Sequence, residues 1–356
     1  MTYRPTLYDI RKVFLMLGNA CNFNCPHCVQ HDCHPSIKKQ IEPEVINWLK
    51  FLSGSRIETF KPTLIFFGGE PLLYRKTMKD VVNELKDSFN YTIISNGSLL
   101  NQTDVDWINS NQIEFVFSND GFYTKCTRDQ NMFDDLHFVN LFNQIENKSV
   151  EGVFHAFNAN PYKFWNYIKS FAPNTKIVLD DLICSGSIPE NYMQFDLEEI
   201  KQIFDQIEKD HILFFNRKLE TSPVVDYLYS KVMTVRKGRK FNELPLCGTC
   251  RTSLNVDTAG KVYLCHNSDV VIGTIQDDII DLVERGTKEL TNRIRALNKA
   301  RQCSSCSAFG FCRGGCPLEE PKRNCSSLCE VRKIQWNTAE KCFNEFLKSE
   351  KENEAA

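Results

Sequence analysis

A short polar segment near the start of the 356-residue chain carries the residue types best suited to holding a metal. This run, GNACNFNCPHCVQHDC at residues 18–33, follows the apolar run VFLML. Cys21, Cys25 and Cys28 in it have the spacing CxxxCxxC. Three thiolates on one short loop can bind three irons of a [4Fe-4S] cluster and leave the fourth iron without a protein ligand. A zinc site completed by Cys33 or a nearby histidine is the alternative, because structural zinc takes four such ligands.

A second motif, GGEP at residues 68–71, follows the apolar run TLIFF. Its glycines let the backbone approach a ligand closely, and Glu70 places a carboxylate beside them. Taken alone, the motif is better explained as a strand-to-helix turn that starts with a proline. Next to a loop of three thiols, it predicts a ligand-binding site.

A second group of cysteines lies near the C-terminus. Four of them have the spacing CxxCx5CxxxC, and these are Cys303, Cys306, Cys312 and Cys316. Others precede and follow this unit, namely Cys247, Cys250 and Cys265 on one side and Cys325 and Cys329 on the other. Such regular spacing predicts metal binding, with a pair of zinc ribbons as the alternative to clusters.

The elements that must position these motifs alternate between strand and helix. Six short apolar runs are typical of buried parallel strands, and they lie at residues 13–17, 63–67, 91–95, 113–118, 150–157 and 176–183. Helix-like segments such as EPEVINWLKFL separate them. The pattern predicts an α/β fold with a parallel sheet or partial barrel. Ligands collect at the carboxyl ends of such strands, where the clusters GNACNFNC, GGEPLL, SNGS and SNDG all lie.

Composition excludes several classes of function. The formal net charge is -2, with 43 Lys+Arg and 45 Asp+Glu, so the chain lacks the basic surface typical of proteins that bind nucleic acid or anionic membranes. No signal peptide and no apolar run long enough to span a membrane are visible. We therefore expect a cytoplasmic protein without nucleic-acid or membrane partners. In that reducing compartment, 16 cysteines indicate metal binding rather than disulfides.

CxxxCxxC after the first predicted strand and a GGE motif after the second resemble the radical S-adenosylmethionine (radical SAM) superfamily. The resemblance implies a cluster on Cys21, Cys25 and Cys28 whose open iron chelates SAM. It further implies that the backbone at 68–71 holds the amino group of SAM. The residues that it assigns to SAM are Gly68, Gly69, Glu70 and Pro71 at the amino group, His27 near the adenine, Ser95, Asn96, Ser118 and Asp120 near the ribose, and Arg128 at the carboxylate. For most of these residues turn capping is the competing interpretation, and for His27 it is space filling beside the cluster.

The C-terminal spacing resembles the SPASM extension of radical SAM enzymes that modify peptides. The resemblance implies two auxiliary [4Fe-4S] clusters, and therefore three clusters and SAM as cofactors. The implied ligands of the first are Cys250, Cys265 and Cys316 with Cys247 as the fourth, and those of the second are Cys303, Cys306, Cys312 and Cys329, with Cys325 as the alternative.

This resemblance predicts an oxidative modification of a ribosomally made peptide, either a thioether or a carbon–carbon or carbon–oxygen crosslink. Sulfatase-maturing relatives carry an acidic base directly after the cysteine of the Gx4C unit, where this chain has His266, which is either a base or a hydrogen-bond donor. Cys126 and Cys184 follow the fourth and sixth predicted strands, where either thiol could serve as the hydrogen donor of a peptide epimerase. A non-catalytic iron–sulfur or zinc protein is the alternative from a different class.

The expected domains are a partial (β/α)6 barrel at 1–195, a helical connector at 196–240, a SPASM domain at 241–345 and a frayed charged tail at 346–356. About a dozen residues precede the first predicted strand, so a leader-binding domain ahead of the barrel is not expected. A peptide would then be recognised by the barrel mouth, the connector or a separate leader-binding protein. Flavodoxin or ferredoxin is the expected reductant.

Overall fold

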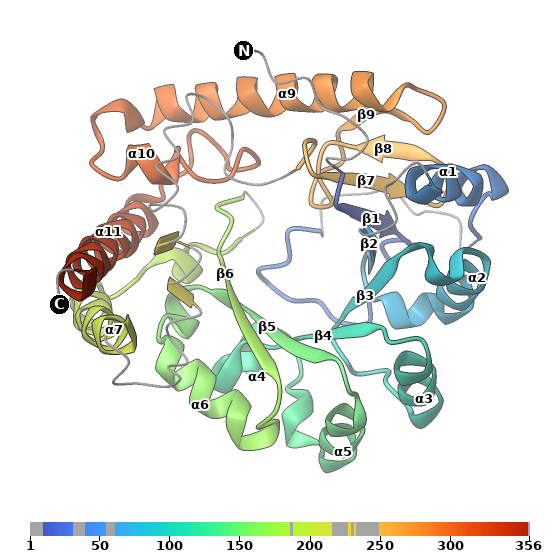
Figure 1. Cartoon of the computed structure of the whole chain (residues 1–356), viewed down its shortest axis with the longest axis horizontal. Helices are drawn as coiled ribbons and strands as arrows, with labels where there is room; N and C mark the ends of the chain where they lie inside the picture. Colours follow the sequence, from blue (N-terminus) through green and yellow to red (C-terminus); the bar gives the residue numbers. More distant parts are fainter. Residues whose placement is uncertain are drawn as a thin grey trace.

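The computed structural model describes residues 10–30, 40–54, 61–185, 188–215, 227–228, 231–232 and 249–354. Its nine-stranded sheet has the order β6-β5-β4-β3-β2-β1-β7-β8-β9. Figure 1 shows this sheet curving into an open ring, with most of the helices on the outside.

The first six strands pair in parallel and in chain order. They are β1 (Lys12–Met16), β2 (Thr63–Phe67), β3 (Asn90–Ser95), β4 (Glu114–Ser118), β5 (Lys148–Phe154) and β6 (Lys176–Asp181). Each overlaps one of the six predicted runs. This confirms the predicted α/β fold with a partial barrel.

Helices connect these strands and cover the outer face of the sheet (Figure 1). They are α1 (Pro43–Gly54), α2 (Arg75–Leu85), α3 (Gln102–Ser110), α4 (Thr124–Thr127), α5 (Leu136–Gln144) and α6 (Pro161–Phe171). Several begin at side-chain caps that satisfy the first backbone N–H groups; Asn101, for example, accepts from Asp104 N at 3.0 Å. Short 3₁₀ helices lie between, at η2 (Pro71–Tyr74), η3 (Lys86–Ser88), η4 (Gly121–Tyr123), η5 (Met132–Asp134), η6 (Ala156–Asn158), η7 (Glu190–Met193) and η8 (Cys303–Ser305).

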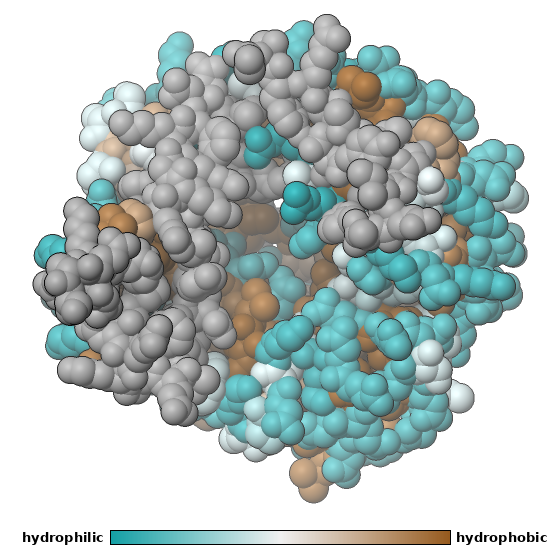
Figure 2. Space-filling view, in the orientation of Figure 1, coloured by the Kyte–Doolittle hydropathy of each residue, from teal (hydrophilic) through white to brown (hydrophobic). Residues whose placement is uncertain are grey.

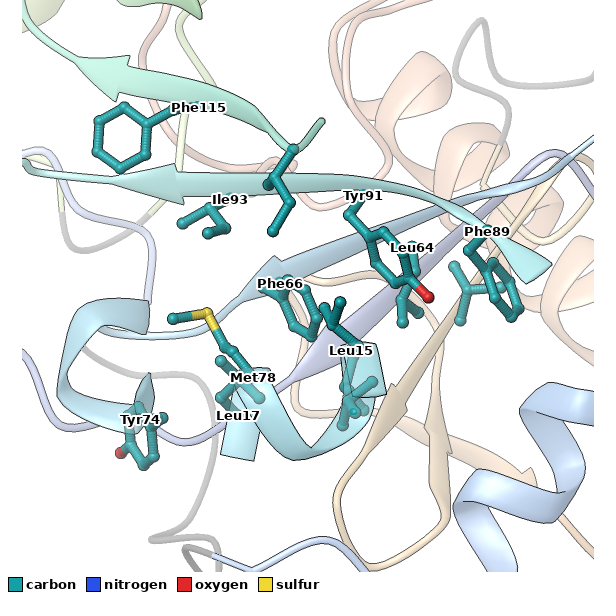
Figure 3. Close-up of a cluster of buried hydrophobic side chains, with 14 of the residues drawn as sticks. Leu15, Leu17, Leu64, Phe66, Tyr74, Met78, Phe89, Tyr91, Ile93 and Phe115 are labelled. Atoms are coloured by element: carbon teal, nitrogen blue, oxygen red, sulfur yellow. The ribbon is translucent and has the colours of Figure 1, made fainter. Parts of the chain in front are cut away.

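The main core fills the space between the sheet and these outer helices. Figure 3 shows Leu15, Phe66 and Ile93 from neighbouring strands, and Met78 from α2 packs with them in the same buried cluster. Because successive strand residues point to opposite faces, Phe14 and other alternate residues point into the ring. The interior of the ring is therefore lined by side chains that the core does not use.

The C-terminal part continues the same sheet. Strand β7 (Ser253–Asp257) pairs in parallel with β1, and β8 (Lys261–Tyr263) and β9 (Val271–Thr274) follow antiparallel. Three helices come next, α9 (Ile279–Ala300), α10 (Phe309–Cys312) and α11 (Ser326–Glu354). Helix α11 packs against α7 (Leu197–Phe215) around a second buried cluster that includes Phe204 and Leu328.

Two of the predicted domain limits can be compared with the described residues. The boundary near residue 240 lies outside the described residues. The stretch predicted as a frayed tail instead continues α11 as far as Glu354, with a Lys348–Glu345 ion pair of 2.5 Å along it. Among the described helices, none combines the length and the apolar character needed to cross a membrane.

Candidate functional site

The CxxxCxxC loop follows β1 directly and holds its three thiols close together. Cys28 N donates to the carbonyl of Cys25 at 3.0 Å, which tightens the loop. Burial raises the pKa of Cys25 to about 12, partly opposed by Arg128 and reinforced by the charges of Cys28 and Cys21. The charges of Cys21 and Cys28 thus act on Cys25 in the same loop. Three converging thiols fit one face of a [4Fe-4S] cluster.

The glycines of GGEP pack directly on the backbone of this thiol loop. Gly69 N donates to Gly18 O at 2.8 Å, and Glu70 N donates to Ala20 O at 2.9 Å. A Cβ at Gly68 would lie 2.4 Å from Gly18 O, and one at Gly69 would lie 2.3 Å from Ala20 O. Only glycine therefore allows the end of β2 to touch the loop.

Glu70 uses its carboxylate to join the ends of β2 and β3. The side chain is 1% exposed and accepts hydrogen bonds from Leu72 N at 2.9 Å, Ser95 Oγ at 2.7 Å and Asn96 N at 2.9 Å. Burial raises the pKa of Glu70, although these hydrogen bonds oppose the shift. The predicted residues Ser95 and Asn96 are thus fixed beside GGEP.

Asn96 also reaches the thiol loop. Its Nδ2 donates to Asn22 Oδ1 at 3.0 Å and lies 3.9 Å from Cys21 Sγ. Its Oδ1 accepts from Ser98 Oγ at 2.6 Å. The carboxyl ends of the first three strands therefore meet at one place, as the sequence predicted for the polar clusters.

Asp120 and Arg128 form a buried ion pair beyond the end of β4. Arg128 Nε donates to Asp120 at 2.8 Å and Nη2 donates at 3.2 Å. Burial alone would raise the pKa of Asp120, but Arg128, His27 and His155 together outweigh it and hold that pKa well below its usual range. The nearby Ser118 ends β4 and is partly buried.

His27 lies against the same carboxylate, with Nε2 3.5 Å from Asp120 Oδ2. Burial lowers the pKa of His27 to about 4, so the ring is neutral at physiological pH. The structure therefore brings together His27, Asp120 and Arg128, three residues that the resemblance assigns to different parts of SAM.

The sequence reasoning missed His155 and Tyr192. His155 is fully buried just after β5, with Nε2 3.8 Å from Asp120 Oδ2. Its ring centroid lies 5.5 Å from that of His27 and 5.0 Å from that of Tyr192. The run VEGVFHAF predicts a strand over residues 150–157, whereas β5 stops at Phe154 and leaves His155 just beyond its end.

His266 lies against the inner wall of the ring. Its imidazole stacks on Phe14 with centroids 4.1 Å apart and meets the edge of Phe67 at 4.8 Å. Because both phenylalanines point inward from β1 and β2, His266 is positioned toward the interior. Figure 2 shows an opening at the centre of the ring, with hydrophobic side chains visible inside it.

The predicted ligands of the first auxiliary cluster are only partly described. Cys250 is buried, with a left-handed backbone (φ +59°), and its thiol donates to Leu264 O at 3.2 Å, next to Cys265. Cys316 is partly buried. Cys247 lies outside the described residues.

Of the predicted ligands of the second auxiliary cluster, Cys306, Cys312 and Cys329 pack against the second buried cluster. Burial, followed by the charges of Cys312 and Cys329, raises the pKa of Cys303 to about 11. The charge of Cys306 also raises the pKa of Cys303. Cys325 lies beside Cys329, with 3.8 Å between their sulfurs. Cys329 as the closing ligand, with Cys325 as the alternative, stays a prediction.

The two predicted hydrogen donors lie in different surroundings. Cys126 is exposed on α4. Cys184 is fully buried. The role of either thiol as a hydrogen donor stays a prediction. The loop after β6 turns into the C-terminal part, where Glu320 N donates to Cys184 O at 3.2 Å.

Comparison with protein families and curated proteins gives consistent matches. Residues 15–115 match the model of the Radical SAM superfamily. The radical SAM cyclopropyl synthase TigE of Paramaledivibacter caminithermalis is 22% identical over 338 residues, which cover 86% of this chain and 68% of that protein. A cysteine-type anaerobic sulfatase-maturating enzyme of Clostridium perfringens strain 13 is 20% identical over 370 residues, 93% of each chain.

Two solved structures share the fold. The enzyme anSMEcpe, with bound AdoMet and Cp18Cys peptide, superposes with a TM-score of 0.68 at 18% identity over 95% of this chain and 98% of that one. SuiB of Streptococcus suis, bound to S-adenosylmethionine, gives a TM-score of 0.58 at 13% identity over 86% of this chain and 73% of that one. The chain thus shares their architecture across the barrel and the cysteine-rich C-terminal part.

Proposed function

The chain belongs to the radical SAM superfamily, and we propose that it cleaves SAM reductively and uses the resulting 5′-deoxyadenosyl radical to modify a peptide oxidatively. The observation that carries the proposal is the direct contact between GGEP and the loop of three thiols. That contact puts a thiolate triad and a ligand-binding backbone at one edge of a parallel sheet, where ligands of such sheets bind.

Cys21, Cys25 and Cys28 would hold the radical-generating cluster. When bound, this cluster supplies the single electron that cleaves the sulfonium of SAM into methionine and the 5′-deoxyadenosyl radical. The backbone at Gly68 and Gly69 would position the methionine amino group. Because those glycines already touch the thiol loop, SAM would be held next to the cluster.

Arg128 would bind the carboxylate of SAM, because a guanidinium can pair with a carboxylate through two parallel hydrogen bonds. Asp120 accepts from Arg128, from Thr127 Oγ1 at 2.9 Å and from Val153 N at 3.0 Å, so its oxygens are engaged by the protein. We therefore assign Asp120 to orienting Arg128. Ser118 and Asn96 remain the candidates for the ribose, and the neutral ring of His27 for the adenine.

The C-terminal cysteines would hold two auxiliary clusters. Cys247, Cys250, Cys265 and Cys316 are proposed for the first, and Cys303, Cys306, Cys312 and Cys329 for the second. When bound, such clusters accept the electron that an oxidative reaction removes from the substrate radical. The proposed product is a thioether, or a carbon–carbon or carbon–oxygen crosslink.

A peptide substrate is supported by the solved relatives, since anSMEcpe was solved with a Cp18Cys peptide and SuiB with its precursor peptide SuiA. We propose that the peptide enters the opening at the centre of the ring. Flavodoxin or ferredoxin would supply electrons in the cytoplasm, and a separate leader-binding protein would present the peptide.

A second candidate function is oxidation of a cysteine or serine to formylglycine. Sulfatase-maturing relatives carry an acidic base directly after the cysteine of the Gx4C unit, and His266, which stands there in this chain and packs against Phe14 and Phe67, would have to act in its place. A neutral imidazole is a competent base near pH 7. The two candidates differ in product, because formylglycine contains an aldehyde that reacts with hydrazides and a crosslink contains none.

The test is anaerobic reconstitution with iron and sulfide, followed by dithionite and SAM. Three four-iron clusters require about twelve irons per chain, and mass spectrometry should detect 5′-deoxyadenosine. The triple variant Cys21→Ala, Cys25→Ala and Cys28→Ala should keep roughly two thirds of the iron and form no 5′-deoxyadenosine. Zinc in place of iron, with SAM left intact, would contradict the proposal.

A further inference from the structure

Two buried histidines point at one carboxylate oxygen where the thiol loop meets the ends of β4 and β5. His27 Nε2 lies 3.5 Å and His155 Nε2 lies 3.8 Å from Asp120 Oδ2. One donor atom from each of the three residues lies within 4.8 Å of the other two, and all three side chains are buried. The SAM cleavage proposed above leaves His155 without a role.

Hydrogen bonds do not account for this arrangement. An N–H···O hydrogen bond is usually about 2.7–3.2 Å long, and both contacts to Asp120 Oδ2 are longer than that. Neither ring nitrogen of the fully buried His155 has a hydrogen-bond partner among the described residues. A neutral imidazole has one donor and one acceptor nitrogen, and burying them unpaired costs free energy. His155 therefore needs a partner other than the protein groups around it.

We propose that His27, Asp120 and His155 bind a divalent first-row transition metal ion. Two imidazole nitrogens and one carboxylate oxygen are a common ligand set for such ions, and they leave further positions open for water. Ligand atoms held at about 2.1 Å from one ion lie roughly 3.0–3.4 Å apart. The observed separations of 3.5 and 3.8 Å need only small rotations of the two imidazoles to reach that geometry.

The other contacts of Asp120 match those of a carboxylate that binds a metal. Such carboxylates are usually hydrogen-bonded by further groups, which orient them. Arg128 Nε and Thr127 Oγ1 donate to Asp120 Oδ2 at 2.8 and 2.9 Å, and Val153 N donates to Oδ1 at 3.0 Å. Because Arg128 already balances the charge of Asp120, the ion binds less tightly than at an unpaired carboxylate.

The three ligands come from separate segments, and aromatic rings pack around them. The ring centroid of Tyr192 lies 5.6 Å from that of His27 and 5.0 Å from that of His155, and Phe157 lies 5.1 Å from Tyr192. A hydrophobic shell of this kind limits the access of solvent to an ion. The bound ion would join the cluster loop to the ends of β4 and β5, so its binding stabilises the folded chain.

The metal site is compatible with the proposed binding of SAM. Coordination uses a nitrogen at the edge of the His27 ring and leaves the faces of that ring available to the adenine. Arg128 keeps its hydrogen bonds to Asp120. The ion is not needed for SAM cleavage itself.

The test uses the full chain with its clusters reconstituted anaerobically and left oxidised, because oxidised [4Fe-4S] clusters give no electron paramagnetic resonance signal. Mn²⁺ is the probe, since it favours carboxylate oxygen over thiolate sulfur. After treatment with a chelating resin, the protein is titrated with Mn²⁺, and binding is measured as loss of the free-ion signal. We expect one Mn²⁺ per chain to bind more tightly than any further ion. Spin-echo spectra of that bound ion should show modulation by imidazole nitrogen.

Matched variants assign the site. His155→Gln and His27→Gln should each weaken Mn²⁺ binding by at least about tenfold, because even the loss of a group that orients a ligand costs that much. His137→Gln is the control, since His137 is exposed at the start of α5, and it should bind Mn²⁺ like the unaltered chain. Circular dichroism and iron analysis would check that each variant is folded and holds its clusters.

The spin-echo measurement on the unaltered chain does not depend on any variant. Bound Mn²⁺ without nitrogen modulation would overturn the proposal, as would unchanged affinity in His155→Gln or no uptake of Mn²⁺ by the unaltered chain. None of these measurements uses SAM, so they test the metal site separately from the proposed function.

Discussion

Asp120 contacts two of the residues proposed to bind SAM, Arg128 and His27. Its carboxylate is fully buried, pairs with Arg128 and lies 3.5 Å from His27 Nε2. A buried charge is tolerated only when it is paired and hydrogen-bonded. The positive guanidinium, the Thr127 hydroxyl and the Val153 N–H meet that requirement, so a single acid fixes the carboxylate-binding arginine and the ring beside the cluster loop.

Cys325 and Cys329 should differ in their effect on iron content. If Cys329 closes the second auxiliary cluster, Cys329→Ser should lower reconstituted iron by about a third, because one of three clusters loses a ligand. Cys325→Ser should leave iron near that of the unaltered chain. Iron analysis by plasma mass spectrometry, with the electron paramagnetic resonance of the reduced clusters, would decide between them. The reverse pattern would make Cys325 the ligand.

Local spacing was enough to predict the thiol loop, GGEP and the C-terminal cysteines, because each motif is read from neighbouring residues. It could not predict the backbone contact between Cys184 and Glu320, since that contact depends on how the loop after β6 packs on a segment far along the chain. His155 was missed for a related reason. Its role near Asp120 depends on where β5 ends, and strand boundaries are set by tertiary packing rather than by the apolar run itself.

At the scale of elements, the end of β2 and the thiol loop approach each other closely where the residues are glycines, Gly68 and Gly69. Gly69→Ala would place a Cβ 2.3 Å from Ala20 O, so the backbone must move. We expect a loss of roughly 1–3 kcal/mol in the free energy of unfolding. The front cluster should also be lost, with about a third of the iron.

The control for this prediction is Gly54→Ala at the end of α1, where nothing lies within 4 Å of the new Cβ. That change should alter stability by less than about 1 kcal/mol. Urea unfolding and iron analysis measure both variants. If Gly69→Ala and Gly54→Ala have the same stability and the same iron content, the close approach at Gly69 is not needed for the fold or for the front cluster.

Helix α7 carries a buried histidine that makes stability depend on pH. Burial lowers the pKa of His211 to about 4, while the unfolded chain protonates it near its usual value of about 6.5. The unfolded state therefore binds more protons between these values, and the free energy of unfolding falls as pH drops. The free energy of unfolding of the unaltered chain should fall by about 2 kcal/mol between pH 7 and pH 5 because of this group, and His211→Leu should not show that fall.

Unfolding by urea at the two pH values would measure this difference. His137→Leu is the control, because His137 is exposed at the start of α5. It should leave the pH dependence of the unaltered chain in place. If the free energy of unfolding of His211→Leu falls between pH 7 and pH 5 as much as that of the unaltered chain, another group causes the pH dependence.

Periodicity predicted the strands β1 to β6, because each buried strand has its own apolar run. It did not predict that β7 would pair with β1. Val256 lies beside Leu15 in the sheet, although the two residues are far apart in the chain. The short strands after Cys250 also lack a long apolar run, so only the assembled sheet reveals their place.

At the scale of the whole molecule, Glu319 connects the two parts of the fold. It pairs with Arg301 and Arg332, and Arg332 donates to Leu182 O after β6. Burial alone would raise the pKa of Glu319, but the two arginines lower it overall. Together with the continuous sheet, this network predicts that the barrel and the C-terminal part unfold as one unit.

Glu319→Gln would leave two buried guanidinium groups without their counter-charge. We expect a loss of roughly 3–5 kcal/mol in the free energy of unfolding, and separate transitions for the two parts. Glu330→Gln is the control, because its ion pair with Lys333 is partly exposed and should contribute at most about 1 kcal/mol. Scanning calorimetry would record both the midpoint and the number of transitions. A single unshifted transition in Glu319→Gln would contradict this account.

The place of β7 beside β1 has a consequence for how the protein is made. Until residues 253–257 leave the ribosome, the first strand of the barrel has one free edge, with its backbone N–H and C=O groups unpaired. Such an edge can pair with the strand of another nascent chain. The sheet can therefore be completed only late in translation, and chaperone binding to the emerging barrel would protect it during that interval.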